Sequence, residues 1–161
     1  MPRIDFSSPE FHYDATDPEG FRNGMLRFGT RVGAKTSGCS LYELPPGQAI
    51  CPYHYEYGEE EWLLVVSGRP TLRTPEGEAE IGPQEIVFFP TGPDGAHLVR
   101  NNTDSTVLVL MFSTRTHPSV AVYPDSDKVG VFTGNKDDDV IVRKASRVDY
   151  FDGEADRPPA V

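Results

Sequence analysis

Short apolar runs separated by turn residues dominate the chain from residue 38 onward. Residues 39–44 alternate between apolar and polar side chains, which is typical of a half-buried strand, and they end at a Pro-Pro-Gly turn. Residues 61–67 and 106–113 are apolar runs that are short for helices and lie between turn signals, so they indicate strands buried on both faces. Further strands are predicted at 51–56, 72–74, 78–81, 86–89 and 96–101, with weaker edge-strand signals at 120–123 and 140–142.

This succession of short strands predicts an all-β fold. No long amphipathic helix lies between the strands, so neighbouring strands should pair in antiparallel fashion. About eight such strands form a double-sheet jelly roll or a barrel, which hides most strand edges. The tapered interior of that architecture brings inward-facing side chains close together.

The pattern divides the chain into three parts around a single domain. Residues 1–37 carry many aromatic side chains without helical or strand periodicity, and we expect an N-terminal arm that packs on the barrel or on a partner subunit. Residues 38–144 are predicted to form the barrel. Residues 145–161 are predicted to form a C-terminal tail, which from about residue 155 should be loose.

Composition and charge narrow the choice of partners. The chain has 161 residues, with 25 acidic against 15 basic side chains and a formal net charge of −10. Because an acidic surface repels phosphate backbones and anionic headgroups, we expect neither nucleic acid nor a membrane surface as partner. No segment approaches the ~20 apolar residues that span a bilayer. With no apolar run of the signal-peptide kind near Met1, and with only Cys39 and Cys51, we expect a cytoplasmic protein with reduced thiols.

Two histidine-bearing segments carry the candidate chemistry. His54 and Glu56 share one face of a strand because side chains alternate, Glu61 opens the next strand, and His97 lies in the second segment. If these strands are neighbours, two imidazoles and two carboxylates point into one cavity and can hold a divalent ion such as Fe, Mn, Ni or Zn. Two alternatives stay open: the histidines are structural, or Glu60 replaces Glu61 as ligand.

The two segments resemble the two sequence motifs of the cupin superfamily, and more narrowly its single-domain, cupin 2-like bacterial members of undefined function. The positions that match those motifs are His54, Glu61, Gly68, Pro90, Gly92, His97 and Asn101. The chain departs from the motifs where Glu56 replaces the second histidine, where Gly47 lies one residue farther away, where Gln84 replaces a glycine, and where residues 93–96 lengthen a gap. The resemblance implies a double-stranded β-helix (jelly-roll) barrel, a metal held at these positions, and a homodimer.

Three functions follow from these patterns. The first is a metal-dependent enzyme of dioxygenase or isomerase type that acts on a small molecule, with His54, Glu56, Glu61 and His97 as metal ligands and no catalytic acid or base assigned. The second is a non-catalytic module that binds a small ligand in the barrel. The third is a metal-free structural barrel. Fold resemblance does not choose among them.

Overall fold

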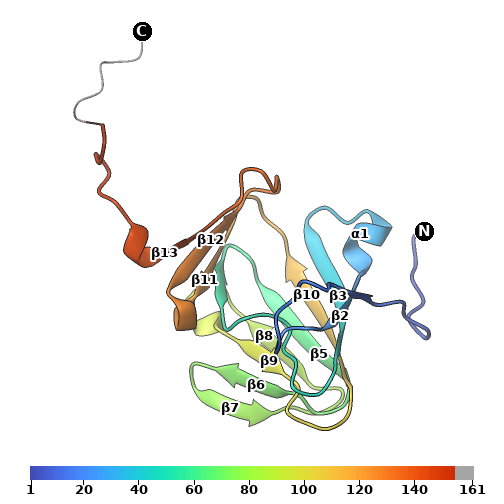
Figure 1. The fold of residues 1–161 in the computed structure, drawn as a ribbon. Helices are drawn as coiled ribbons and strands as arrows, with labels where there is room; N and C mark the ends of the chain where they lie inside the picture. Colours follow the sequence, from blue (N-terminus) through green and yellow to red (C-terminus); the bar gives the residue numbers. More distant parts are fainter. Residues whose placement is uncertain (155–161) are drawn as a thin grey trace.

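The computed structural model describes residues 1–154, and its regular elements are almost all β-strands (Figure 1). One short α-helix and three 3₁₀ turns accompany the strands in this part of the chain. In chain order the elements are β1 (His12–Tyr13), β2 (Gly24–Arg27), α1 (Phe28–Val32), β3 (Ser37–Leu44), β4 (Tyr55–Tyr57), β5 (Glu61–Ser67), β6 (Thr71–Thr74), β7 (Gly77–Glu80), β8 (Ile86–Phe89), η1 (Pro93–Gly95), β9 (Leu98–Arg100), β10 (Val107–Thr114), β11 (Ser119–Tyr123), η2 (Pro124–Ser126), β12 (Lys128–Phe132), β13 (Val140–Arg143) and η3 (Lys144–Ser146).

The strands form three antiparallel sheets. The largest has the order β1-β2-β3-β10-β5-β8, the second β13-β12-β11-β4, and the third β7-β6-β9. In Figure 1 the six-stranded sheet lies on one side of the molecule, the four-stranded sheet on the other, and the three-stranded sheet below them. The predicted all-β fold with antiparallel pairing is confirmed. No helix within residues 1–154 is long and apolar enough to cross a membrane, and the cytoplasmic location stays a prediction.

The core lies against the inner face of the six-stranded sheet. Alternate residues of β10, such as Val107 and Val109, are fully buried there, together with Leu63 and Val65 of β5. The residues between them face a second cluster on the opposite side of the sheet, where Leu110 packs with Leu26, Phe28 and Leu41. Burial on both faces explains why the sequences of β5 and β10 are apolar runs and do not alternate.

The N-terminal residues extend the six-stranded sheet. Strand β2 pairs with β3, β1 pairs with β2, and α1 packs on β3 beside them (Figure 1). These elements are only two to five residues long, which is too short for hydrophobic periodicity to reveal them. The division of the chain at residues 38 and 145 stays a prediction, and the loose tail expected from residue 155 lies outside the described residues.

Asn101 ties the loop between β9 and β10 to the end of β3. Its side chain is fully buried, and its Nδ2 donates to the carbonyl oxygens of Leu44 and Ser105, each at 2.8 Å. Its Oδ1 accepts hydrogen bonds from the backbone and side chain of Thr103. All the hydrogen-bonding groups of the amide are therefore used inside the protein.

We predict that Asn101→Ala lowers the free energy of unfolding by roughly 2–4 kcal/mol, because it leaves buried carbonyl groups without donors. The matched control is Asn102→Ala, since Asn102 is exposed and makes one hydrogen bond, to Thr71 Oγ1. That change should cost no more than about 0.5 kcal/mol. Urea denaturation of the two variants measures the difference, and equal losses would contradict the assignment.

Candidate metal centre

Three side chains from separate segments meet at one point inside the protein. His54 precedes β4, His97 follows the η1 turn, and Glu61 is the first residue of β5. The backbones of His54 and His97 form an isolated antiparallel bridge, with N–H···O distances of 2.8 and 3.1 Å in the two directions. Because directly opposite residues of a bridge project to the same side, the two imidazoles lie together, with ring centroids 4.8 Å apart.

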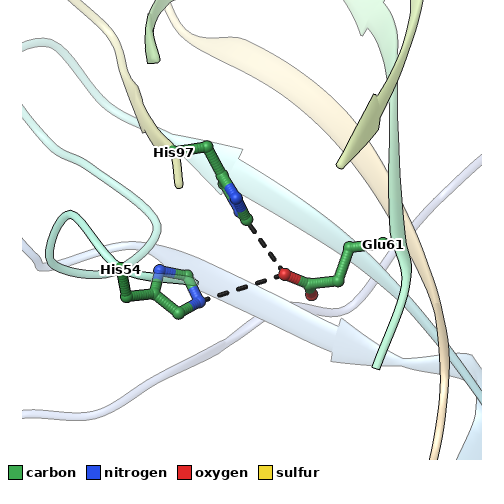
Figure 2. Close-up of side chains that lie close together, drawn as sticks. All are labelled: His54, Glu61 and His97. Carbon is green, nitrogen blue, oxygen red and sulfur yellow. Dashed lines mark ion pairs between the residues drawn. The ribbon is translucent and has the colours of Figure 1, made fainter. Parts of the chain in front are cut away.

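Glu61 is the third member of this group of side chains. Its Oε2 lies 3.4 Å from His97 Nε2 and 3.9 Å from His54 Nε2 (Figure 2), and the three ligand atoms all lie within 4.8 Å of one another. Ligand atoms that share an ion at about 2.0–2.2 Å are roughly 3–3.5 Å apart. The 3.4 Å distance lies in this range and the 3.9 Å distance is longer, so the three groups would draw slightly closer around an ion. Glu60, the alternative ligand, is exposed.

The hydrogen bonds of the histidines decide which ring nitrogen faces this point. His54 Nδ1 lies 3.0 Å from the carbonyl oxygen of Pro52, and His97 Nδ1 lies 2.9 Å from that of Gly95. A carbonyl oxygen only accepts, so each Nδ1 carries the proton and donates it. Each Nε2 then presents a lone pair toward Glu61, which is the arrangement that metal-binding histidines adopt.

The η1 turn that supplies the carbonyl for His97 needs a glycine at residue 95. A Cβ at that position would clash with the carbonyl oxygen of Pro90. The turn contains the extra residues of the 93–96 segment, which lengthens the gap before His97 relative to the motif described above. His97 nevertheless lies directly opposite His54.

An aromatic ring stacks on each of the two imidazoles. The Phe89 ring stacks on His97 at 3.7 Å between centroids and 9° between planes, and Tyr123 stacks on His54 at 5.9 Å and 21°. Neither ring was singled out from the sequence, because both contacts depend on which strands become neighbours. Phe89 is placed by its position directly opposite Glu61 in the β5–β8 pair.

Burial sets the charge states of the three groups. It lowers the pKa of His54, and burial together with the neighbouring His54 lowers the pKa of His97 to about 3, so both imidazoles are neutral. Burial, with a smaller contribution from Glu59, raises the pKa of Glu61 to about 7. Neutral imidazoles and a carboxyl that ionises near neutrality are a donor set that a cation would stabilise.

Glu56 lines the same cavity from β4 but lies outside the close group of three. Its Oε2 is buried and has no hydrogen-bond partner among residues 1–154. Burial, and then the charge of Glu61, raises the pKa of Glu56 to about 9. A buried carboxylate oxygen without a partner is costly unless something positive completes it.

The cavity above these side chains measures about 410 Å³. Cys51 lies on its wall, with Sγ 3.5 Å from the outward Nδ1 of His54, and burial raises the pKa of its thiol. The wall also includes Glu59, Arg115 and His117. The space suits a small molecule, and the buried groups at its floor can approach that molecule directly.

Residues 40–113 match the family model described as a cupin domain. Together with the fold, this match shows that the chain contains a cupin domain over these residues. The resemblance seen in the sequence and the predicted jelly-roll fold are thereby confirmed. A comparison with curated proteins gives no match.

Two solved structures are similar over most of their length. One is a protein from Acidithiobacillus ferrooxidans provisionally named a sugar phosphate isomerase, with 27% identity, coverage of 89% of this chain and 91% of that chain, and a TM-score of 0.78. The other is a cupin-superfamily protein from Silicibacter pomeroyi named a sugar phosphate isomerase, with 26% identity, coverage of 94% and 98%, and a TM-score of 0.79. The polyketide cyclase RemF from Streptomyces resistomycificus shares the fold at 21% identity, with coverage of 71% and 79% and a TM-score of 0.58.

The buried carboxyl groups predict that the metal-free protein loses stability as pH rises. A carboxyl whose pKa is higher in the folded state stabilises the fold below its ordinary pKa of about 4.3, and that contribution is lost as pH rises through the folded value. The lowered histidine pKa values act in the opposite direction, but only below about pH 6.5. Between pH 6.5 and 9 the loss should therefore reach roughly 2–3 kcal/mol and come mainly from Glu56.

Glu56→Gln tests this assignment, because the amide keeps the shape of the carboxyl and does not titrate. Urea denaturation of the metal-free variant across pH 6.5–9 should show a much flatter dependence than the wild type. Glu76→Gln is the control, since Glu76 is exposed and its hydrogen bond to Thr74 lowers its pKa, so it is ionised throughout this range. An unchanged slope in Glu56→Gln would refute the role given to that residue.

Proposed function

We propose that this cupin domain binds one divalent metal ion through His54, Glu61 and His97, with Glu56 as a fourth ligand. The observation that carries the proposal is the pair of Nε2 lone pairs directed at one carboxylate oxygen in a buried site. Without an ion, Glu61 can satisfy at most one of the two nitrogens, and only by holding a proton. A metal ion satisfies all three groups at once.

The unpartnered Oε2 of Glu56 supports a fourth ligand. Two carboxylates would neutralise the charge of a divalent ion, which lowers the cost of holding it in a low-dielectric interior. Mixed imidazole and carboxylate donors suit iron, manganese, nickel and zinc. Four protein ligands leave positions on an octahedral ion open to a small molecule in the 410 Å³ cavity.

We propose further that the protein is a metal-dependent isomerase and that its substrate is a phosphorylated sugar. The support is the naming of two proteins, similar over most of their solved chains, as sugar phosphate isomerases, the first provisionally, together with a cavity lined by the proposed ligands. A bound ion would polarise a substrate carbonyl or hydroxyl. The protein residues orient the substrate and exclude water, and Phe89 and Tyr123 hold the ligand rings in place. Dioxygenase chemistry and a non-catalytic binding module are the alternatives that the assay below separates.

We predict about one metal ion per chain in protein purified without chelators, and loss of both metal and turnover in His97→Ala. Removing one of the three closest donors should weaken metal binding at least tenfold, since even indirect partners of ligands cost 10–100-fold. Elemental analysis measures the metal. Proton NMR with a panel of aldose and ketose phosphates measures isomerisation, and oxygen uptake tests the dioxygenase alternative.

His12→Ala is the matched control, because His12 lies on the edge strand β1 and is exposed. It should retain metal and turnover. Stoichiometric metal in His97→Ala would refute the ligand assignment. Metal binding without conversion of any sugar phosphate would instead favour the non-catalytic module.

We also propose that the chain forms a homodimer through the outer face of β5, β8 and β10. Trp62, Ile86, Phe88 and Phe112 are each at least 40% exposed on these strands, and Trp62 contacts Phe88 at 4.6 Å between ring centroids. Strand β8 is also an edge of the sheet. Contiguous exposed apolar side chains of this kind mark association surfaces.

The expected result is a molar mass of two chains in light scattering, with Phe88→Glu shifting the protein to one chain. Val148→Glu is the control, since Val148 is also an exposed apolar residue but lies beyond β13. A wild-type protein that is monomeric at micromolar concentration would exclude this interface.

A further inference from the structure

A second cavity of about 270 Å³ lies beside the metal centre, and we call it the polar pocket. It shares Tyr42, Glu59 and Arg115 with the cavity above the histidines, so the two spaces adjoin. Its own wall adds mainly hydrogen-bond donors and one further cation. These residues are Arg27, Thr30, Ser37, Ser40 and Ser113.

Strand register connects this pocket with the proposed ligands. Ser113 of β10 lies directly opposite Gly38 of β3 on one side and Glu61 of β5 on the other. Directly opposite residues project to the same face of a sheet, so Ser113 lies between the pocket and the ligand carboxylate. In the neighbouring row, Arg27 of β2 lies opposite Ser40. A molecule in the pocket would therefore extend along this face toward the metal centre.

A missing side chain keeps the floor of the pocket open. A Cβ at Gly38 would clash with Ser113 Oγ, so only glycine leaves this hydroxyl undisturbed. A Cβ at Gly29 would come within 3.3 Å of the backbone nitrogen of Cys39, so glycine lets α1 lie close against β3 at the side of the pocket. The pocket beside these glycines is lined mainly with polar side chains.

Among the described residues, no carboxylate lies within salt-bridge distance of either guanidinium group of the polar pocket. Within residues 1–154, no salt bridge involves Arg27 or Arg115, whereas Arg22, Arg69 and Arg73 each contact a carboxylate. Nε of Arg27 donates to Met25 Sδ at 3.3 Å, and Nη2 of Arg115 lies 3.4 Å from His117 Nε2. Most of their N–H groups therefore remain available to a ligand.

We propose that the polar pocket binds the phosphate group of the substrate, with Arg27 and Arg115 as its charged contacts and the serine hydroxyls as further donors. This inference rests on the proposed function, because it assumes that the rest of the substrate reaches the metal centre. Guanidinium groups match the geometry of phosphate oxygens and bind them with paired hydrogen bonds. Glu59 is the carboxylate that lines the pocket, and its Oε1 accepts a hydrogen bond from the backbone of Thr116. Two cations against this single anion leave a net positive charge in the pocket lining, which favours an anionic ligand.

Isothermal titration of metal-free protein with inorganic phosphate tests the pocket apart from the metal. Arg115→Gln and Arg27→Gln should each weaken phosphate binding roughly 10- to 100-fold, since each removes charged hydrogen bonds. Ser113→Ala, which removes a single hydroxyl, should weaken it less. Arg31→Gln is the control, because Arg31 is a nearby exposed cation that does not line the polar pocket. It should bind phosphate as the wild type does.

Three results would overturn the proposal. They are unchanged phosphate affinity in both arginine variants, an equal loss in Arg31→Gln, and acetate binding as tight as phosphate binding, which would mark a carboxylate site. Elemental analysis of the same variants keeps the two proposals separate. Normal metal content together with weakened phosphate binding supports the polar pocket. If phosphate binding depends on Arg27 and Arg115 but the wild-type protein has no affinity for metal, the pocket is supported and the metal centre is refuted.

Discussion

The short backbone bridge between His54 and His97 is the constraint on which the site depends. Its two hydrogen bonds join the start of β4 to the segment before β9, and thereby link the four-stranded sheet to the three-stranded one. The Nδ1 hydrogen bonds to Pro52 and Gly95 then fix the direction of each ring. Since these partners are backbone carbonyls two residues away, local chain geometry orients both lone pairs before any ion arrives.

Holding these groups together costs stability in the metal-free protein. Burial raises the pKa values of Glu56 and Glu61, with smaller contributions from Glu61 on Glu56 and from Glu59 on Glu61, and these raised values express that cost. The well-packed inner core beside them, with Leu63 and Val65 on the same strand as Glu61, offsets it. Buried side chains that lower stability until a bound ion neutralises them are typical of a functional site.

Much of this arrangement follows from the sequence, because it depends on local patterns. The alternation of 39–44 and the apolar run of 106–113 correspond to β3 and β10, and spacing placed His54, Glu61 and His97 in one cavity. Contacts that depend on strand neighbours could not be foreseen. The contacts of Phe89 with His97, of Tyr123 with His54 and of Arg27 with Ser40 join segments whose pairing only the folded chain decides. The very short β1 and β2 carry too little periodicity to be recognised.

The central claim is that one ion is shared by His54, Glu61 and His97. A crystal structure of protein grown with manganese or zinc, with anomalous data collected at the metal edge, tests it directly. The account predicts one anomalous peak about 2.0–2.2 Å from both Nε2 atoms and from a Glu61 carboxylate oxygen. An empty space between these atoms in protein saturated with metal, or a peak bound elsewhere on the chain, would contradict it.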